Sequence, residues 1–493
     1  MPTFNLVDRP WIPVLFLDGT TRECSLKEVV KEATTIAQIQ GNPLESAVLH
    51  RLLLALAHLV NNPNTLDDWL AIWNSKESLL QQIDNYLSVN HAKLDLYDSK
   101  FPFAQNINVE NIIKTPANMI YERSQGNNAV FIDGSLVSKP QPIPSSVAAR
   151  SLLVFHACGG SGTGSQNPFD KSGTMYAGPL CARMIALIEG KNLAETLVLN
   201  MAIGRKIGTP TWDRPLCNPA KLTQSSGLSD LYTRATRNVL LIPNEDGAQC
   251  IGINSFMGEG INSEAEVTGD PHLPLYLSKD KTFKPLRIDP KKALWRNSSA
   301  LLAHKASADT KPLASVALLA ELKSYGLLED LEKHRIRTLG ASADAKGPVT
   351  ELWRDESLPF SLSLFNSDTD YQHLATAVET AEQIAKTLSG RLYRFAASYL
   401  SNGGGAPDRK DVDKLIDEIC PNLNDYWLAI GPEGEKLAIQ RQPLEEWLAT
   451  CNTASHSAFQ KAIDRLTPDS RRLRAQFATS SEPSAKTKGS KTA

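Results

Sequence analysis

The sequence lacks the residue patterns that define several common protein classes. Its seven cysteines are far apart, odd in number and include no CxxC pair, so we expect free thiols rather than a disulfide scaffold or a zinc ribbon. Its nine histidines include no HxxxH or HExxH spacing, and we therefore expect no metal site and no cofactor. No catalytic constellation stands out among the carboxylates, which favours a protein that is not an enzyme.

Long apolar runs and a charge of one sign are also missing. The longest apolar run, residues 52–60, is interrupted by His58 and is far shorter than the roughly 20 residues that cross a bilayer. The N-terminus shows no signal peptide, so we expect a cytoplasmic protein without a membrane partner. Lys and Arg total 52 against 54 Asp and Glu, a formal charge of -2. This balance excludes a histone-like protein but permits local basic patches.

What is present predicts an α+β protein of 493 residues, in which residues 1–360 form a large mixed α/β domain. A run rich in β-branched and aromatic residues over 4–17, followed by Asp18-Gly19, predicts a hairpin. Ser25 and Glu28 have the spacing of a capping box that starts a helix.

Three further stretches of this domain have interpretable patterns. Residues 44–60 are apolar over most of a helical surface and follow Asn42-Pro43, which predicts a capped core helix. A helical period returns between residues 179 and 203. Residues 238–290 alternate short apolar runs with turn formers, which predicts strands and hairpins.

The part after Phe360 is predicted to be helical. An apolar seam with 4-3 spacing indicates one long helix of a bundle, and we expect a C-terminal four-helix bundle over residues 361–480. The seam consists of Leu374, Val378, Ala381, Ala385, Leu388, Leu392, Phe395 and Tyr399. Shorter helical stretches follow at about 409–420, 424–431, 443–452, 455–466 and 470–478. The Ser/Lys/Thr-rich residues 481–493 are expected to be a disordered tail.

The most unusual segment is HACGGSGTG at residues 156–164, which holds four glycines in six positions from Gly159. Glycines allow a backbone to approach a ligand closely, although a simple flexible loop would have the same composition. Gly164 is not followed by the Lys-Ser/Thr of a phosphate-binding loop, and Thr163 replaces the last glycine of a nucleophile elbow around Ser161. The common forms of nucleotide binding are therefore disfavoured.

An enzymatic reading of the same segment remains as an alternative. The glycine-rich loop could cradle a nucleotide or acyl substrate, with His156 or Ser161 in the chemistry, and His156 with Cys158 could be imagined as a nucleophile pair. No third orienting residue accompanies them, so a structural role is favoured. Nucleotide-dependent thermal stabilisation would separate the enzyme from the alternatives.

Basic residues gather in the C-terminal part. Arg391 and Arg394 flank Tyr393 on the long predicted helix, and residues 461–493 hold eight Lys and Arg against three Asp and Glu. Such residues can neutralise phosphates, and Tyr393 could stack on a base, although a solvated helix face would look the same.

The order of several landmarks resembles the CasA family, the large subunits of the type I-E CRISPR surveillance complex, Cascade. The landmarks that carry the resemblance are residues 6–14 (LVDRPWIPV), 100–105 (KFPFAQ, similar to the family's HPF-x-Q), 128–133 (NAVFID, similar to its N-x-A-F-V-N loop), 159–164 (the glycine cluster) and 208–212 (GTPTW, similar to its Q-P-T-W). The resemblance spans the chain to about residue 478.

The resemblance implies a DNA-recognition subunit without catalytic residues. Such a subunit inspects double-stranded DNA for a protospacer-adjacent motif and helps to open the duplex so that the CRISPR RNA can pair. The complex then recruits a helicase-nuclease. By this likeness the motif is read by the glycine loop, whose members here are Gly159, Gly160, Ser161, Gly162, Thr163 and Gly164. Arg391 and Arg394 would guide DNA strands along the bundle.

Two other elements take roles from the resemblance alone. The loop with Asn128, Phe131, Ile132 and Asp133 would anchor the chain near the RNA and the adjoining subunits, with Phe131 as its apolar anchor; without the family, Phe131 could equally be a core aromatic.

A duplex wedge would lie in residues 340–350, where Lys346, Gly347 and Pro348 occupy a tip that holds glutamine in the best-known members. An ordinary surface hairpin is an equal alternative for this segment. A lysine that some members direct at the motif has no match around Glu259 and Gly260, and the cysteine pairs of some members are absent, so the preferred motif can differ.

Overall fold

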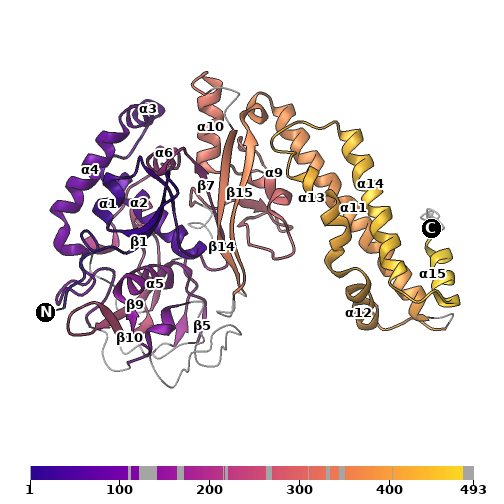
Figure 1. Ribbon diagram of the computed structural model, residues 1–493, viewed down its shortest axis with the longest axis horizontal. Helices are drawn as coiled ribbons and strands as arrows, with labels where there is room; N and C mark the ends of the chain where they lie inside the picture. Colours follow the sequence, from indigo (N-terminus) through magenta and orange to yellow (C-terminus); the bar gives the residue numbers. More distant parts are fainter. Residues whose placement is uncertain are drawn as a thin grey trace, which may run out of the picture. The chain divides into compact units, whose positions relative to one another are not determined.

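The computed structural model separates the chain into two compact units (Figure 1). It describes residues 2–108, 113–120, 141–163, 171, 173–214, 216, 220–261, 269–308, 310–328, 333–343, 350–401 and 404–480. Unit 1 comprises Met1–Lys292 and Ala300–Leu362, and unit 2 comprises Ala293–Ser299 and Ser363–Ala493. The division lies close to the boundary expected at Phe360. It differs in one respect, because the short segment 293–299 belongs with the C-terminal helices.

The N-terminal β-unit forms as its turn residues predict. Strands β1 (Ile12–Phe16) and β2 (Thr21–Cys24) pair antiparallel around Asp18-Gly19, and β3 (Ile36–Ile39) completes a sheet of order β2-β1-β3. Helix α1 (Leu26–Lys31) follows β2, and Ser25 and Glu28 form the predicted capping box. Local sequence signals are sufficient here because each turn and cap is made by residues a few positions apart.

Helix α2 (Pro43–Val60) is the core helix that its apolar sequence predicts. Asn42 caps it, Pro43 lies in its first turn, and its residues from Leu44 to His58 are almost all buried. By length and composition α2 could cross a membrane, but 78% of the relevant window is buried inside the fold, as in the core helix of a folded domain. Helices α5 (Ser145–Cys158) and α7 (Leu228–Thr233) pack against it.

A long hairpin forms the second main sheet of unit 1. Strands β14 (Lys333–Ala343) and β15 (Thr350–Ser361) pair antiparallel over their full length, and β7 (Met184–Glu189) joins β14 on its other side. The helical period expected over residues 179–203 is therefore wrong for β7, and only α6 (Leu193–Leu199) is helical. β7 is apolar at consecutive positions because both of its faces are buried, and such a run cannot be distinguished from a buried helix by periodicity.

The remaining elements of unit 1 follow the expected mixture of strands and helices. The other strands are β4 (Ile143–Pro144), β5 (Gly162–Thr163), β6 (Thr174–Met175), β8 (Lys221–Thr223), β9 (Arg237–Pro243), β10 (Gln249–Met257), β11 (Glu259–Ile261), β12 (Leu275–Leu277) and β13 (Phe283–Pro285). They form the sheets β4-β10-β9, β11-β8, β12-β13 and β5-β6. The other helices before Ser363 are α3 (Leu66–Asn74), α4 (Lys76–Val89), α9 (Ser298–Leu301) and α10 (Ala314–Ser324).

Unit 2 is helical, as predicted. Its helices are α11 (Asp368–Ser401), α12 (Arg409–Ile419), α13 (Asn424–Gly434), α14 (Leu444–Asp464) and α15 (Ser470–Ser480). The predicted seam of α11 is buried from Leu374 to Phe395, and α12, α14 and α15 all pack on α11. A fifth helix, α15, thus joins the four of the expected bundle.

Helix α14 also corrects the expected break near residue 453. Its Asn, Thr and Ser residues favour a break locally, but Cys451, Ala454 and Ala458 are buried against the other helices, and this packing keeps one continuous helix.

Candidate nucleic-acid interface

The glycine-rich segment begins where helix α5 ends. Cys158 is the last residue of α5, Gly159 is its C-cap, and Gly162–Thr163 form strand β5, which pairs with β6. Short strands of this kind are held by few hydrogen bonds, so the position of the loop depends on its other anchors. Gly164 lies outside the described residues, as does the side chain of Thr163.

Two backbone hydrogen bonds attach the start of the loop to the segment after β6. The N–H of Gly178 donates to the carbonyl of Gly159 over 2.7 Å, and the N–H of Leu180 donates to the carbonyl of Ala157 over 2.7 Å. A Cβ at Gly178 would lie 2.4 Å from the Ala157 carbonyl oxygen, so only glycine allows this approach. The end of α5 and the chain at residue 178 are thus in direct backbone contact.

Arg237 is a third anchor, which the sequence did not reveal. Its side chain is 1% exposed, and its Nη2 donates to the carbonyl of Gly160 over 2.9 Å. A Cβ at Gly159 would come within 2.6 Å of the same Nη2 and of the Phe155 carbonyl oxygen. The guanidinium therefore holds the backbone of the loop at Gly160 and places a buried positive charge next to it.

The next glycines face open space. A Cβ at Gly160 would meet no atom of the described residues within 4 Å, and the same holds at Gly162, whose φ of +153° is one that L side chains rarely adopt. Gly159 is thus required by the packing of the protein, and Gly162 by its backbone conformation. Neither reason applies to Gly160, so its lack of a side chain serves nothing within the described fold and leaves its backbone accessible to a ligand.

His156 and Cys158 are buried in the protein core and do not line a reaction site. His156 Nε2 donates to the Ala104 carbonyl over 2.9 Å, and its Nδ1 accepts from the N–H of Arg237 over 3.3 Å. Burial lowers the pKa of His156 to about 4, so the ring is neutral, and burial raises the pKa of the Cys158 thiol. Both imidazole nitrogens are occupied by the fold, and His156 cannot act as a base toward Ser161.

The cavities do not support the enzymatic alternative either. A cavity of about 830 Å³ is lined by residues of β3, β7, α6 and β14, but by no residue of the glycine loop. Within the described part of the chain, no group of three or more His, Cys, Asp or Glu is arranged to hold a metal ion. The six cysteines of the described ranges are free thiols, as the spacing predicted.

The glycine loop and the long hairpin are connected through one short segment. The chain runs from Gly178, which contacts the loop, into β7, whose Met184 pairs with Gly340 of β14. A Cβ at Gly340 would lie 2.5 Å from the Arg183 carbonyl oxygen, which shows how closely β14 packs on this segment. In Figure 1, β5 and one end of the β14–β15 hairpin both lie toward the lower edge of unit 1.

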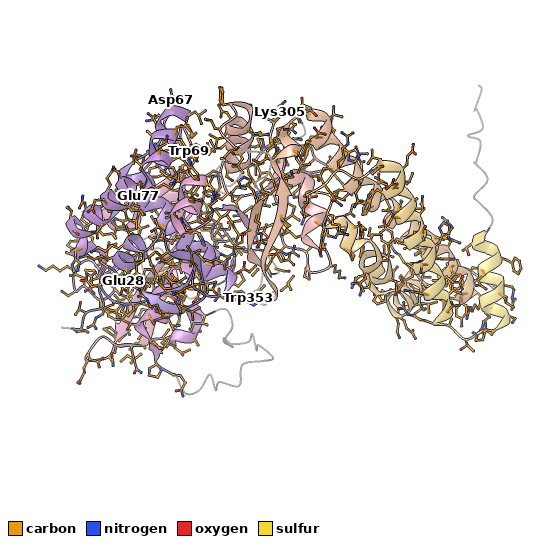
Figure 2. The ribbon with its side chains drawn as sticks, turned by 45° about the horizontal axis from the view of Figure 1, so that its top comes forward. Glu28, Asp67, Trp69, Glu77, Lys305 and Trp353 are labelled. Carbon is orange, nitrogen blue, oxygen red and sulfur yellow. The ribbon has the colours of Figure 1, made fainter. Side chains whose placement is uncertain are left out.

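The tip of the hairpin, with Lys346, Gly347 and Pro348, lies outside the described residues, and so do Asn128, Phe131, Ile132 and Asp133. The arms of the hairpin are paired up to Ala343 and Thr350. Trp353, labelled in Figure 2, lies on β15 opposite Ala341 near that end.

Arg391 and Arg394 of unit 2 differ in their surroundings. The Arg391 guanidinium lies 3.8 Å from the ring centroid of Phe459 on α14, and burial, together with the neighbouring Arg394, lowers its pKa. Arg394 and Tyr393 are exposed. Of the two arginines, Arg394 is therefore the one that is available to a phosphate.

Comparisons with known proteins agree over the length of both units. A family model described as CRISPR-associated protein Cse1 matches residues 5–476. The CRISPR-associated protein CasA/Cse1 of Thermus thermophilus is 27% identical over 442 residues, which cover 87% of this chain and 85% of the relative.

Solved structures share the fold. A crystal structure of Thermus thermophilus CasA has a TM-score of 0.80 at 25% identity and covers 97% of this chain and 98% of its own. A chain from a structure described as a CRISPR RNA-guided surveillance complex has a TM-score of 0.79 at 19% identity, covering 97% and 99%.

Proposed function

Because the chain belongs to the CRISPR-associated Cse1 family, we propose that it is the large subunit of a type I-E RNA-guided surveillance complex, Cascade, and reads a protospacer-adjacent motif in double-stranded DNA. The resemblance found in the sequence is confirmed by the family match and by the fold. The observation that carries the motif-reading part is the glycine loop, which Arg237 and Gly178 anchor and in which no described atom lies within 4 Å of a Cβ placed at Gly160 or Gly162.

The geometry of the loop suits a groove of DNA. With no side chain at Gly160 or Gly162, backbone groups can approach base edges where a Cβ would collide. The buried charge of Arg237 adds a positive potential next to the loop, which favours a polyanion. The minor groove presents a largely degenerate pattern, so a backbone reader inserted there tolerates several motifs. Sequence specificity itself is delegated to pairing with the guide RNA, as in other RNA-guided effectors.

The long hairpin takes the role of duplex wedge in this proposal. Its arms, β14 and β15, form a long antiparallel ladder whose register shifts once, between Ser342 and Ala343, and β7 connects β14 to the segment that contacts the glycine loop. A tip with Lys346, Gly347 and Pro348 would combine a phosphate-binding cation with an apolar residue that can unstack a base step. Motif binding and opening of the duplex would then occur on the same unit of the chain.

The proposed partners follow from the same assignment. The 128–133 loop would contact the RNA-containing subunits, the exposed Arg394 with Arg391 would guide a DNA strand, and a separate helicase-nuclease would cut the target. This chain would contribute recognition and no catalytic step.

The decisive test compares duplexes that differ only in the base pairs flanking the target. The RNA-loaded complex is measured with the wild-type chain, without the chain, and with Gly160→Asp. We expect flank-dependent affinity with the wild type and none with the other two. Gly405→Asp is the matched control, because a Cβ at Gly405 also meets no described atom within 4 Å. Flank-dependent binding that survives Gly160→Asp would refute motif reading by this loop.

A further inference from the structure

Five charged side chains form a cluster in unit 1. Asp230 of α7 and Glu259 of β11 are its two anions, and Arg214, Arg234 and Lys221 are its three cations. The sequence separates them by up to 45 positions, and no motif connects them. They meet because β11 pairs in parallel with β8, which places Lys221 directly opposite Glu259.

The two arginines already neutralise the two carboxylates. Arg234 donates to Asp230 over 2.8 Å and to Glu259 over 3.2 Å, and Arg214 lies 3.4 Å from Asp230 and 3.0 Å from Glu259. Buried carboxylates require such pairing. Lys221 Nζ is 3.9 Å from Glu259, at the limit of an ion pair, and its side chain is 53% exposed. Among these five described side chains there is thus one more cation than there are anions, and the most exposed of the cations is Lys221.

Strand β8, which carries Lys221, is linked to the glycine loop by a chain of contacts. Gly162 of β5 pairs with Met175 of β6, and Tyr176 follows directly. A Cβ at Gly260 would lie 2.9 Å from Tyr176 Cβ and 2.8 Å from Leu222 Cδ2, so Tyr176, Gly260 and Leu222 are in close contact. Leu222, the neighbour of Lys221, is 45% exposed.

These contacts limit the distance between the loop and the lysine. Consecutive Cα atoms are 3.8 Å apart and paired strands are about 5 Å apart. Added along the contacts from Gly162 through Tyr176 and Leu222, these steps place the Lys221 Cα within roughly 25 Å of the Gly162 Cα. This is less than one turn of B-DNA, about 34 Å. The separation between the loop and Lys221 is therefore within the length of one turn of a duplex whose groove receives the glycine loop.

We propose that Lys221 binds a phosphate of the duplex that the glycine loop reads, with Leu222 against the adjoining sugar, so that β8 forms a second wall of the DNA site. This inference rests on the proposed function. A lysine acts on a phosphate as a point charge and carries no base information. It contributes affinity and salt dependence, whereas flank preference stays with the loop.

The test measures the salt dependence of DNA affinity in the RNA-loaded complex that contains the full chain. Each phosphate contact contributes about 0.9 to the slope of log affinity against log salt. We expect Lys221→Ala to lower that slope by about 0.9. Between roughly 50 and 200 mM salt, the fold-loss of affinity of the variant should then be about 3.5 times smaller than that of the wild type. The weakening should be equal on preferred and non-preferred flanks, and Lys221→Arg should restore the slope.

The controls separate failure of this inference from failure of the proposed function. Lys31→Ala removes an exposed lysine of α1, a helix that packs on α4, and should leave the slope unchanged. A wild-type slope in Lys221→Ala, in a complex where Gly160→Asp abolishes flank dependence, overturns the role of Lys221 alone. Flank dependence that persists in Gly160→Asp overturns the proposed function, and with it this inference.

Discussion

Adjacent glycines of the loop should respond in opposite ways to the same substitution. Gly160→Ala adds a methyl group to open space at a φ that L residues adopt, so the fold should be unchanged or up to about 1 kcal/mol more stable through the smaller entropy of the unfolded chain. Gly159→Ala places a methyl group 2.6 Å from both Arg237 Nη2 and the Phe155 carbonyl oxygen. Overpacking of this kind costs about 1–3 kcal/mol.

The two variants should therefore differ in the free energy of unfolding by about 1–4 kcal/mol, although they are neighbours with the same chemical change. Urea denaturation of the isolated chain, monitored by a signal that reports on unit 1, measures this difference in the free energy of unfolding. In DNA binding, Gly160→Ala should weaken flank-dependent affinity although it does not lower stability. Equal stability of the two variants would refute the assignment of Arg237 as the anchor of the loop.

Three other expectations follow from the described contacts. Arg394→Ala should lower the salt slope of DNA affinity by about 0.9 without changing flank preference, and a slope equal to that of the wild type would contradict this. Arg391→Ala should mainly lower stability, by about 0.5–2 kcal/mol, through loss of the Phe459 contact. Trp447→Phe should destabilise unit 2 by about 1–3 kcal/mol in denaturant unfolding, because the buried Ala377 carbonyl loses its 2.7 Å hydrogen bond from the indole N–H. Four histidines of unit 1 are buried with lowered pKa values: His50, His58 and His156 at about 4, and His272 at about 3. Since the unfolded chain binds protons at these sites below about pH 6.5 and the folded chain does not, the contribution of these histidines should be constant above that pH, and stability should fall as the pH drops toward 4, by up to about 1.4 kcal/mol per pH unit for each histidine. An unfolding free energy that is the same at pH 7 and pH 5 would contradict this effect of the buried histidines.

Two of the motifs that carried the family resemblance contribute side chains to the core. Trp11 is buried and its indole N–H donates to the Leu6 carbonyl over 2.9 Å. The Gln105 side chain bonds the backbone at Leu96 and Leu241, over 2.7 and 2.8 Å. Side chains fixed by such buried contacts specify the fold, which explains why the family could be recognised from them.

Where the sequence prediction of structure was wrong, the cause was tertiary packing. Strand β7 resembled a helix because both of its faces are covered, and α14 continues through polar residues because its opposite side is buried. In both cases the deciding contacts come from elements that are remote in the sequence, which no local pattern reports.

Residues a few positions apart were sufficient to predict the α+β class, the capped helices, the seam of α11 and the position of the glycine loop. The family followed from the order of landmarks along the chain. The tertiary structure was needed to show which glycine serves packing and which meets no described atom, since Arg237 and Gly178 reach the loop from elsewhere in the chain. It also decided that the most exposed cation of the charged cluster is Lys221. Charges balance through space, and their balance is fixed only when the fold brings distant residues within a few ångströms.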